Sequence, residues 1–355
     1  MAVRKKKGNA DPSFFDLPVQ DLRSGWYSDK YFTRTKDTLK RSRLHPRVTM
    51  QVFCRARAVL CGVGEVLAVL RACSDRPKEL RVRTLYDGAH VKPWESVMHI
   101  IGDYSSFAHL ETIYLGILSR RTSVATAVRN VVDQAGGKEV LFFSSRFDHF
   151  SNQPGDGYAA LTGGASSVST DANGAWCGQK GVGTVPHGLI AASGGDTVKA
   201  LLAFDQRTPK SVKRIALVDF DNDCVDTSLR VARALGRKLW GVRLDTAGDL
   251  WDRSIKRRTL RNRGVSIELV RNVRRALDRG GFRWVKIMIS GGFTAERLAE
   301  FKRSKVPFDA VGVGAAFFRE RVEFTADIVQ VNGLPCAKVG RKFRPNRRLK
   351  WVTFQ

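Results

Sequence analysis

Residues 285–318 read VKIMISGGFTAERLAEFKRSKVPFDAVGVGAAFF, and this stretch indicates the class of fold. An apolar segment, VKIMIS, ends at Gly291 and Gly292, an amphipathic segment follows, and the second apolar segment is AVGVG. Apolar runs without polar alternation are typical of strands that are buried on both faces, and a helix between them indicates a parallel pair. The stretch therefore predicts a strand–helix–strand unit with glycines after both strands.

The same alternation extends back along the chain to residue 139. Strands are predicted at EVLFFSS (139–145), RIALVDF (214–220) and LWGVRLD (239–245), and helices at residues 196–206, 226–236 and 266–281. A long series of such units without a GxGxxG fingerprint favours a (β/α) barrel over a Rossmann sheet. We therefore predict an irregular (β/α) barrel over residues 126–324.

The remaining residues have a different pattern. Short strands are predicted at 48–54, 58–62, 80–86 and 97–102 around a helix at 64–73, and two further helices at 104–121 and 123–135. The tail after residue 325 has no helical pattern, so we expect it to pair with the N-terminal strands. The predicted class is α/β, with a smaller α+β domain formed from residues 13–125 and the C-terminal return 325–355, preceded by a flexible basic tail, 1–12.

Charge and cysteine content indicate the kind of partner that the protein binds and the redox state of its thiols. Among its 355 residues, 61 Lys and Arg stand against 34 Asp and Glu, which gives a net charge of +27. This excess favours anionic partners, although a basic solvated surface would explain it equally well. No apolar run approaches the ~18–20 residues of a membrane helix, and the basic N-terminus lacks the apolar region of a secretory signal. The six cysteines form no CxxC pair, so we expect reduced thiols in a cytoplasmic protein without structural zinc.

The ends of the predicted strands carry the candidate functional residues, because barrel enzymes place their sites there. Glycines after the last two strands, followed by helix N-termini, are typical of phosphate-binding loops; the alternative is that they only form tight turns. The candidates are Ser290, Gly291, Gly292, Gly312 and Gly314.

Charged residues follow the other strands. Asp219 and Asp245 could hold a metal, bind ribose hydroxyls or stabilise a developing cation, or else cap the next helix. Arg146 and Arg243 could bind a carboxylate or phosphate, although most arginines in such a chain lie on the surface. His187, in GTVPHGLI, could act as a base, ligand or phosphoryl acceptor, or be structural.

Several motifs occur in the order found in one enzyme family. They are SDKYFTRT, LETIYLGILSRRTSVATAV, FFSSRF, GTVPHGLI, GVRLDTAGDL, ISGGF, VGVGAAF and AKVGRK, which together extend from about Tyr27 to Arg341. The chain resembles the nicotinate phosphoribosyltransferases, which are type II phosphoribosyltransferases, and looks most similar to their shorter archaeal-type branch.

The resemblance implies a reaction in NAD biosynthesis. Nicotinate would displace pyrophosphate from phosphoribosyl pyrophosphate to give nicotinate mononucleotide, with Mg²⁺ present and ATP hydrolysis coupled through a phosphohistidine. Tyr31 would stack on nicotinate, Arg146 and Arg243 would bind its carboxylate or the phosphoribosyl group, and His187 would accept the phosphoryl group. Asp219 and Asp245 would face the ribose and metal, and the glycines after the last two strands would bind the 5′-phosphate. The resemblance also implies a homodimer or higher homo-oligomer.

Some residues depart from the family pattern. Phe147 stands where a second arginine is frequent, Phe220 follows Asp219 where threonine is common, and DTAGD is one residue longer than the usual motif. Nicotinamide or quinolinate therefore remains an alternative base. A non-catalytic barrel homologue that binds nucleic acid through the basic run GRKFRPNRRLK is a further alternative, although no motif with interleaved aromatics supports nucleic acid as a partner.

Overall fold

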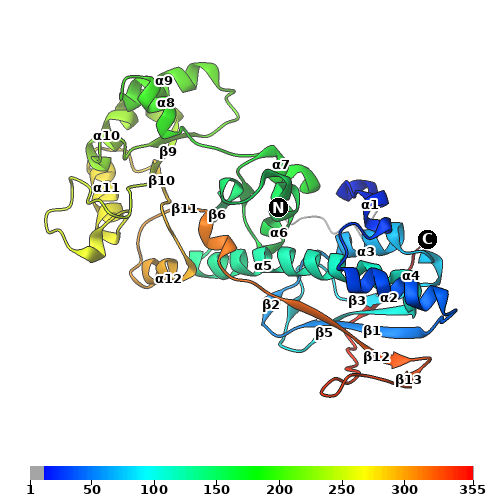
Figure 1. Ribbon diagram of the computed structural model, residues 1–355. Coiled ribbons are helices and arrows are strands. Elements are labelled where there is room, and N and C mark those ends of the chain that lie inside the picture. Colours follow the sequence, from blue (N-terminus) through cyan, green and yellow to red (C-terminus); the bar gives the residue numbers. More distant parts are fainter. Residues whose placement is uncertain (1–11, 355) are drawn as a thin grey trace. The chain divides into compact units, whose positions relative to one another are not determined.

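The chain forms two compact units in the computed structural model, which describes residues 12–354 (Figure 1). Within these residues, unit 1 comprises 12–127, 158–163 and 320–354, and unit 2 comprises Val128–Gly157 and Gly164–Arg319. The predicted flexible basic tail, residues 1–12, lies outside the described residues except for Pro12. None of the helices in the described part is long and apolar enough to cross a membrane.

Unit 1 is built on an antiparallel sheet with the strand order β13-β12-β1-β5-β3-β14. Its strands are β1 Arg47–Cys54, β3 Arg81–Thr84, β5 Ser96–Asp103, β12 Phe324–Val331, β13 Leu334–Pro335 and β14 Lys350–Val352. Strand β12, from the C-terminal part, lies along β1 with Val48 opposite Val331 and Cys54 opposite Phe324 (Figure 1). These pairings confirm the prediction that the tail joins the N-terminal part in one α+β domain. The small strands β2 (Ala58–Val59) and β4 (His90–Val91) pair separately.

The helices of unit 1 pack around this sheet. They are α1 Val19–Ser24, α2 Lys30–Arg41, α3 Val63–Cys73 and α4 Tyr104–Phe107, with short 3-10 turns η1 Pro12–Phe15, η2 Pro77–Glu79 and η3 Ala108–Leu110. Val66, Val69 and Leu70 of α3 are fully buried in one core with Met50 of β1 and Met98 of β5. Because apolar residues recur at helical spacing along α3 and at alternate positions in the strands, both elements bury one face in this core.

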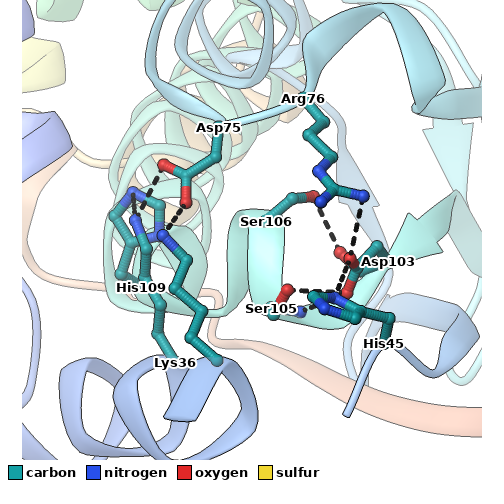
Figure 2. Close-up of polar contacts among 9 residues, drawn as sticks. Lys36, His45, Asp75, Arg76, Asp103, Ser105, Ser106 and His109 are labelled. Carbon is teal, nitrogen blue, oxygen red and sulfur yellow. Dashed lines mark hydrogen bonds and ion pairs between the residues drawn. The ribbon is translucent and has the colours of Figure 1, made fainter. Parts of the chain in front are cut away.

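Polar contacts join α2 to Asp75 and η3, and others form at the start of α4 (Figure 2). Lys36 Nζ lies 2.9 Å from Asp75 Oδ1 and 3.3 Å from His109 Nε2, and the His109 side chain is buried. Asp103 accepts a hydrogen bond from the backbone N–H of Ser105 at 2.9 Å. Asp103 is thus the N-cap of α4.

The prediction of two separate helices at 104–121 and 123–135 is wrong. After α4 and η3, one helix, α5 Glu111–Ala135, runs without a break from unit 1 into unit 2. Ser123 gives its hydroxyl proton to the carbonyl of Ser119 inside the helix, and the Thr122 hydroxyl bonds Cys61. Both polar groups are satisfied without interrupting the helix, so the hydroxyl pair does not end it.

Unit 2 contains a parallel sheet with the order β7-β6-β11-β10-β9-β8. Its strands are β6 Glu139–Phe142, β7 Ser167–Val168, β8 Arg214–Leu217, β9 Leu239–Leu244, β10 Lys286–Ile289 and β11 Ala310–Val313. The helices are α6 Gln153–Gly163 (shared with unit 1), α7 Asp171–Gly174, α8 His187–Ala192, α9 Thr197–Arg207, α10 Cys224–Leu235, α11 Ile267–Arg279 and α12 Ala295–Arg303, with short 3-10 turns between them. This half-barrel of parallel strands confirms the predicted fold class.

The helices of unit 2 begin at clear capping residues. Ser266 caps α11 and Thr294 caps α12 through their side-chain oxygens. Asp223 caps α10, because its side chain accepts the hydrogen bond from the backbone N–H of Asp226 in the first turn. Asp219 lies before this cap, so it does not cap α10.

Candidate active site

The parallel sheet brings the predicted strand-end residues of unit 2 to one edge. Because parallel strands point the same way, residues that follow their carboxyl ends share that edge. In sheet order, Ser144 follows β6, Gly314 follows β11, Ser290 follows β10, Asp245 follows β9 and Asp219 lies just beyond β8. Ser144 and Gly314, which are 170 positions apart in the sequence, are thus neighbours at this edge, as the barrel prediction requires.

Arg243 is the centre of a hydrogen-bond network at this edge. Its Nε donates to Ser290 Oγ at 2.8 Å, Nη1 donates to Thr184 Oγ1 at 3.1 Å and Nη2 donates to Asp245 Oδ2 at 2.8 Å. The Ser290 hydroxyl lies 2.7 Å from Asp245 Oδ1. The guanidinium and the serine together hold the Asp245 carboxylate by both of its oxygens.

The Arg243 side chain is only 14 % exposed, and its guanidinium lies 5.4 Å from the centre of the Phe143 ring. Each Nη atom carries a second N–H that can still bind an anion. The arrangement can therefore position Asp245 and still bind a substrate carboxylate or phosphate.

His187 and Asp219 form a second pair. His187 Nε2 lies 3.1 Å from Asp219 Oδ2, and the histidine side chain is 46 % exposed while the aspartate side chain is 7 % exposed. The ring of Phe220 lies 6.5 Å from that of His187. His187 stands at the start of α8, so a loop and a strand end from distant parts of the sequence meet here.

The Asp219 carboxyl is in an unusual environment. Burial raises its pKa, the neighbouring His187 lowers it, and the negative charge of Asp245 raises it, with a raised value as the result. Oδ1 of Asp219 is buried and has no hydrogen-bond partner among the described residues. A buried carboxylate oxygen without a partner is costly, so this atom is suited to a cation or to a hydroxyl donor from a ligand.

The glycine candidates differ in their surroundings. Gly291 and Gly292 are exposed and have φ values of +88° and +76°, which glycine adopts most readily. They form the loop between β10 and α12, whose first N–H groups face this loop. Gly312 is buried, and a Cβ there would lie 2.6 Å from the Phe143 ring, so packing alone accounts for that glycine.

Gly314 and Arg146 both lie close to the ring of Phe147. A Cβ on Gly314 would come within 2.5 Å of the Phe147 ring, and the Gly314 carbonyl accepts the Ser144 hydroxyl at 2.8 Å. Arg146 is exposed, with its guanidinium 5.5 Å from the Phe147 ring centre. Phe147, which replaces a frequent family arginine, thus covers Gly314 rather than offering a second charge.

Tyr31 lies in unit 1, in the first turn of α2, and its side chain is 60 % exposed. Its hydroxyl is 3.5 Å from Asp29 Oδ2, and burial, Asp29 and Glu111 each raise its pKa. Its predicted contact with nicotinate stays a prediction.

Sequence reasoning did not single out Thr184 or Phe143, which contact the Arg243 guanidinium. Both stand in motifs that the sequence analysis quotes, Thr184 in GTVPHGLI and Phe143 in FFSSRF. Their role follows from contacts between residues 59 or more positions apart, which no local pattern reveals.

Comparison with known proteins agrees with this arrangement. Residues 29–122 match the family described as quinolinate phosphoribosyl transferase, N-terminal domain. The nicotinate phosphoribosyltransferase pncB1 of Mycobacterium tuberculosis (strain ATCC 25618 / H37Rv) is 26 % identical over 377 residues, which cover 95 % of this chain and 78 % of that protein.

Two solved structures share the fold. The nicotinate-nucleotide pyrophosphorylase from Pyrococcus furiosus superposes with a TM-score of 0.81 at 34 % identity, over 95 % of this chain and 85 % of that one. Human nicotinic acid phosphoribosyltransferase superposes with a TM-score of 0.70 at 18 % identity, over 87 % and 75 %. The full-length match at 34 % identity, together with the curated relatives, goes beyond a shared fold. The chain belongs to the family of phosphoribosyltransferases that contains the nicotinate-nucleotide pyrophosphorylase from Pyrococcus furiosus, and it is similar to the nicotinate phosphoribosyltransferases.

Proposed function

We propose that this chain transfers the phosphoribosyl group of phosphoribosyl pyrophosphate to nicotinate in NAD biosynthesis. The pyridine nitrogen forms a bond to ribose C1′ while the bond from C1′ to the pyrophosphate oxygen breaks, which yields nicotinate mononucleotide and pyrophosphate. The observation that carries the proposal is the pair of carboxylates, Asp219 and Asp245, at the ends of neighbouring strands beside the Gly291–Gly292 loop.

The residue types suit this chemistry. The pyridine nitrogen is already a nucleophile, so the site needs no strong base. Positive charge develops on the ribose in the transition state, and the carboxylates of Asp219 and Asp245 would stabilise it. The Gly291–Gly292 loop and the N-terminus of α12 would bind the 5′-phosphate, since the first N–H groups of a helix have no partner within the helix and Thr294 caps only that of Arg297.

The residues of the site fit the Mg²⁺ that the family implies. No group of three or more His, Cys, Asp or Glu side chains in residues 12–354 could hold a metal by itself. Mg²⁺ is usually bound through one or two carboxylates plus substrate phosphates, and Asp219 Oδ1 is a buried oxygen without a partner. Asp219 and Asp245 would therefore hold an ion that arrives with the substrate and neutralises charge on the leaving pyrophosphate.

We further propose that ATP hydrolysis is coupled through His187. Asp219 accepts from Nε2 of this histidine, which leaves Nδ1 with a lone pair and with no partner in the described part of the chain. The ring is half exposed, so a γ-phosphoryl group could reach Nδ1. Attack by Nδ1 would break the bond to ADP and form a phosphohistidine that water later hydrolyses.

Quinolinate is the second candidate base, because residues 29–122 match the quinolinate family. Quinolinate carries two carboxylates and needs more cations than nicotinate does. At the sheet edge of unit 2, Phe147 and Phe220 occupy positions that could carry polar or charged groups, and Arg243 already pairs with Asp245. These features favour the base with a single carboxylate, nicotinate, with Arg146 as the partner of that carboxylate.

A product assay tests the proposal. Purified protein is mixed with phosphoribosyl pyrophosphate, Mg²⁺ and nicotinate, nicotinamide or quinolinate, each with and without ATP. Nicotinate mononucleotide formed faster with ATP would support reaction, base and coupling together. Product from quinolinate alone would show that quinolinate, not nicotinate, is the substrate base. No product from any base would refute the proposed activity. We also expect a cytoplasmic homodimer or higher homo-oligomer, which fractionation and light scattering would test.

A further inference from the structure

A cavity lined by arginines lies in unit 2 beside the helices α11 and α12. Its volume is about 710 Å³, and its lining includes Arg261, Arg271, Arg274, Arg275 and Arg297. The lining does not include His187, Asp219, Arg243 or Asp245. The cavity is therefore separate from the edge of the parallel sheet that carries these candidate residues, which we call the catalytic edge.

Most of the arginines that line the cavity have no carboxylate partner. Glu268 and Glu300 are the acidic residues in its lining, and Arg274 is paired at 2.7 Å with Asp278 outside it. The other four arginines form no ion pair within the described residues. Three of them donate to neutral oxygens instead: Arg271 Nη2 to the carbonyl of Ser304 at 2.7 Å, Arg297 Nη2 to that of Val265 at 2.9 Å, and Arg275 to the carbonyl of Arg271 at 3.3 Å and to the side-chain oxygen of Asn272 at 2.6 Å.

Arg297 is the most enclosed of these unpaired cations. Burial lowers the pKa of its guanidinium, and the nearby Glu300 opposes this effect without an ion pair. A half-buried cation that bonds only neutral oxygens is under-compensated, so an anion in the cavity would offset its desolvation.

Other residues that line the cavity already have hydrogen-bond partners. Asn262 accepts from the Thr259 backbone N–H at 2.8 Å and donates to the Glu268 carboxylate at 3.0 Å. Glu268 is thereby engaged by a neutral donor. The arginines come from α11, α12 and the turn before α11, so they approach the cavity from different elements.

We propose that this cavity is a second anion site that binds a polyphosphate group, either free or as part of a nucleoside triphosphate. Several planar guanidinium forks around one space match the oxygens of linked phosphates better than those of a single carboxylate. The volume exceeds the needs of one phosphate and falls in the range of small-molecule sites.

The cavity is connected to the catalytic edge through Arg297. Its Nη1 lies 3.5 Å from the carbonyl of Gly291, and its Nη2 bonds Val265 in the segment that leads from Asp245 to α11. An anion that draws Arg297 toward the cavity would loosen both contacts. Bound polyphosphate would therefore change the affinity of the Gly291–Gly292 loop for the sugar phosphate, a consequence that rests on the proposed function.

Isothermal titration with inorganic tripolyphosphate tests the site directly. The variants are R271Q/R275Q, which removes two cavity guanidiniums, and the control R279Q/R283Q, which removes two exposed arginines outside the lining of the cavity. We expect binding to weaken roughly tenfold for each guanidinium lost in the first variant and to stay unchanged in the control. Equal weakening in both variants would show a non-specific charge effect and overturn the proposal, as would no binding to the wild type.

A replacement variant and a second ligand complete the test. If R271Q/R275Q does not fold, as judged by circular dichroism, R261Q takes its place because Arg261 is exposed. ATP in place of tripolyphosphate separates the two sources: tighter binding of ATP that R271Q/R275Q weakens favours a nucleotide.

In the product assay, tripolyphosphate should shift the KM for phosphoribosyl pyrophosphate in the control but not in R271Q/R275Q. An equal shift in both variants would overturn the coupling. Binding is measured without turnover, so an inactive protein that still binds tripolyphosphate at the cavity would refute only the proposed function.

Discussion

Replacement of Arg243 by lysine is the sharpest test of the catalytic edge. The guanidinium donates to Ser290, Thr184 and Asp245, which come from three different parts of the chain. A lysine ammonium keeps the charge but has a single donor centre, so it can reach Asp245 or the hydroxyl groups but cannot copy the planar fork. The change therefore tests geometry at constant charge.

The expected loss follows from the bonds removed. Lysine can retain one of the three contacts, and each lost hydrogen bond to a charged group in this largely buried setting is worth about 1.5 kcal/mol. Two such losses give about 3 kcal/mol, which corresponds to a fall in kcat/KM of roughly a hundredfold if they act in the transition state. Most of the loss should be in kcat, since in the proposed reaction Asp245 would stabilise charge that develops only in the transition state.

The assay measures nicotinate mononucleotide formation in Arg243→Lys and in the control Arg230→Lys. Arg230 is exposed and lies 3.7 Å from Asp196 and 4.0 Å from Asp226, away from the network. The control should stay within twofold of the wild type, and both variants should melt near the wild-type temperature. A kcat/KM of Arg243→Lys within threefold of the wild type would refute the view that this network organises catalysis.

Three further predictions test other parts of the molecule. His187→Ala should abolish the stimulation by ATP but leave slow ATP-independent transfer, and loss of all transfer in a folded protein would contradict the phosphohistidine. Gly291→Ala should raise the KM for phosphoribosyl pyrophosphate at least about fivefold, because a side chain is strained at φ +88°, whereas Gly281→Ala, with φ +82° at the end of α11, should leave the KM unchanged. Burial raises the pKa of the Glu111 carboxyl to about 8, although a hydrogen bond from Tyr104 opposes the shift. Between the pKa of the unfolded chain and this value, the folded protein keeps the carboxyl proton that the unfolded chain releases. As the pH rises from about 5 to 8, the wild type should therefore lose stability relative to Glu111→Gln by about 1 kcal/mol per pH unit, and parallel melting curves across this range would refute the assignment.

The residues at the strand ends are an example of what the local sequence pattern predicts. The alternation of apolar strands and amphipathic helices follows from the spacing of side chains along each element, so the parallel sheet of unit 2 and the candidates Asp219, Asp245 and Ser290 are predictable from the sequence. Once the strands are parallel, those residues must share one edge. The α+β domain was predictable in the same way, because no helix follows residue 325 and unpaired strands need a partner.

Other features depended on contacts that local pattern does not encode. The sequence predicts separate helices at 104–121 and 123–135, yet in the structure the hydroxyls of Thr122 and Ser123 bond Cys61 and Ser119, and α5 continues through them. Gly312 has the same glycine signal as Gly291, but only the packed structure shows that the Phe143 ring fills its space.

The class of fold, the order of the elements and most of the candidate site residues can be predicted from the sequence, because each depends on residues that are near in the chain or on motifs shared with relatives. How those residues contact one another is visible only in the folded chain. The pairing of His187 with Asp219 and the fork from Arg243 to Thr184 join residues 32 and 59 positions apart. The arginine cavity likewise depends on which guanidiniums the packing of α11 and α12 leaves without a carboxylate, and charge balance of this kind is a property of three-dimensional neighbours.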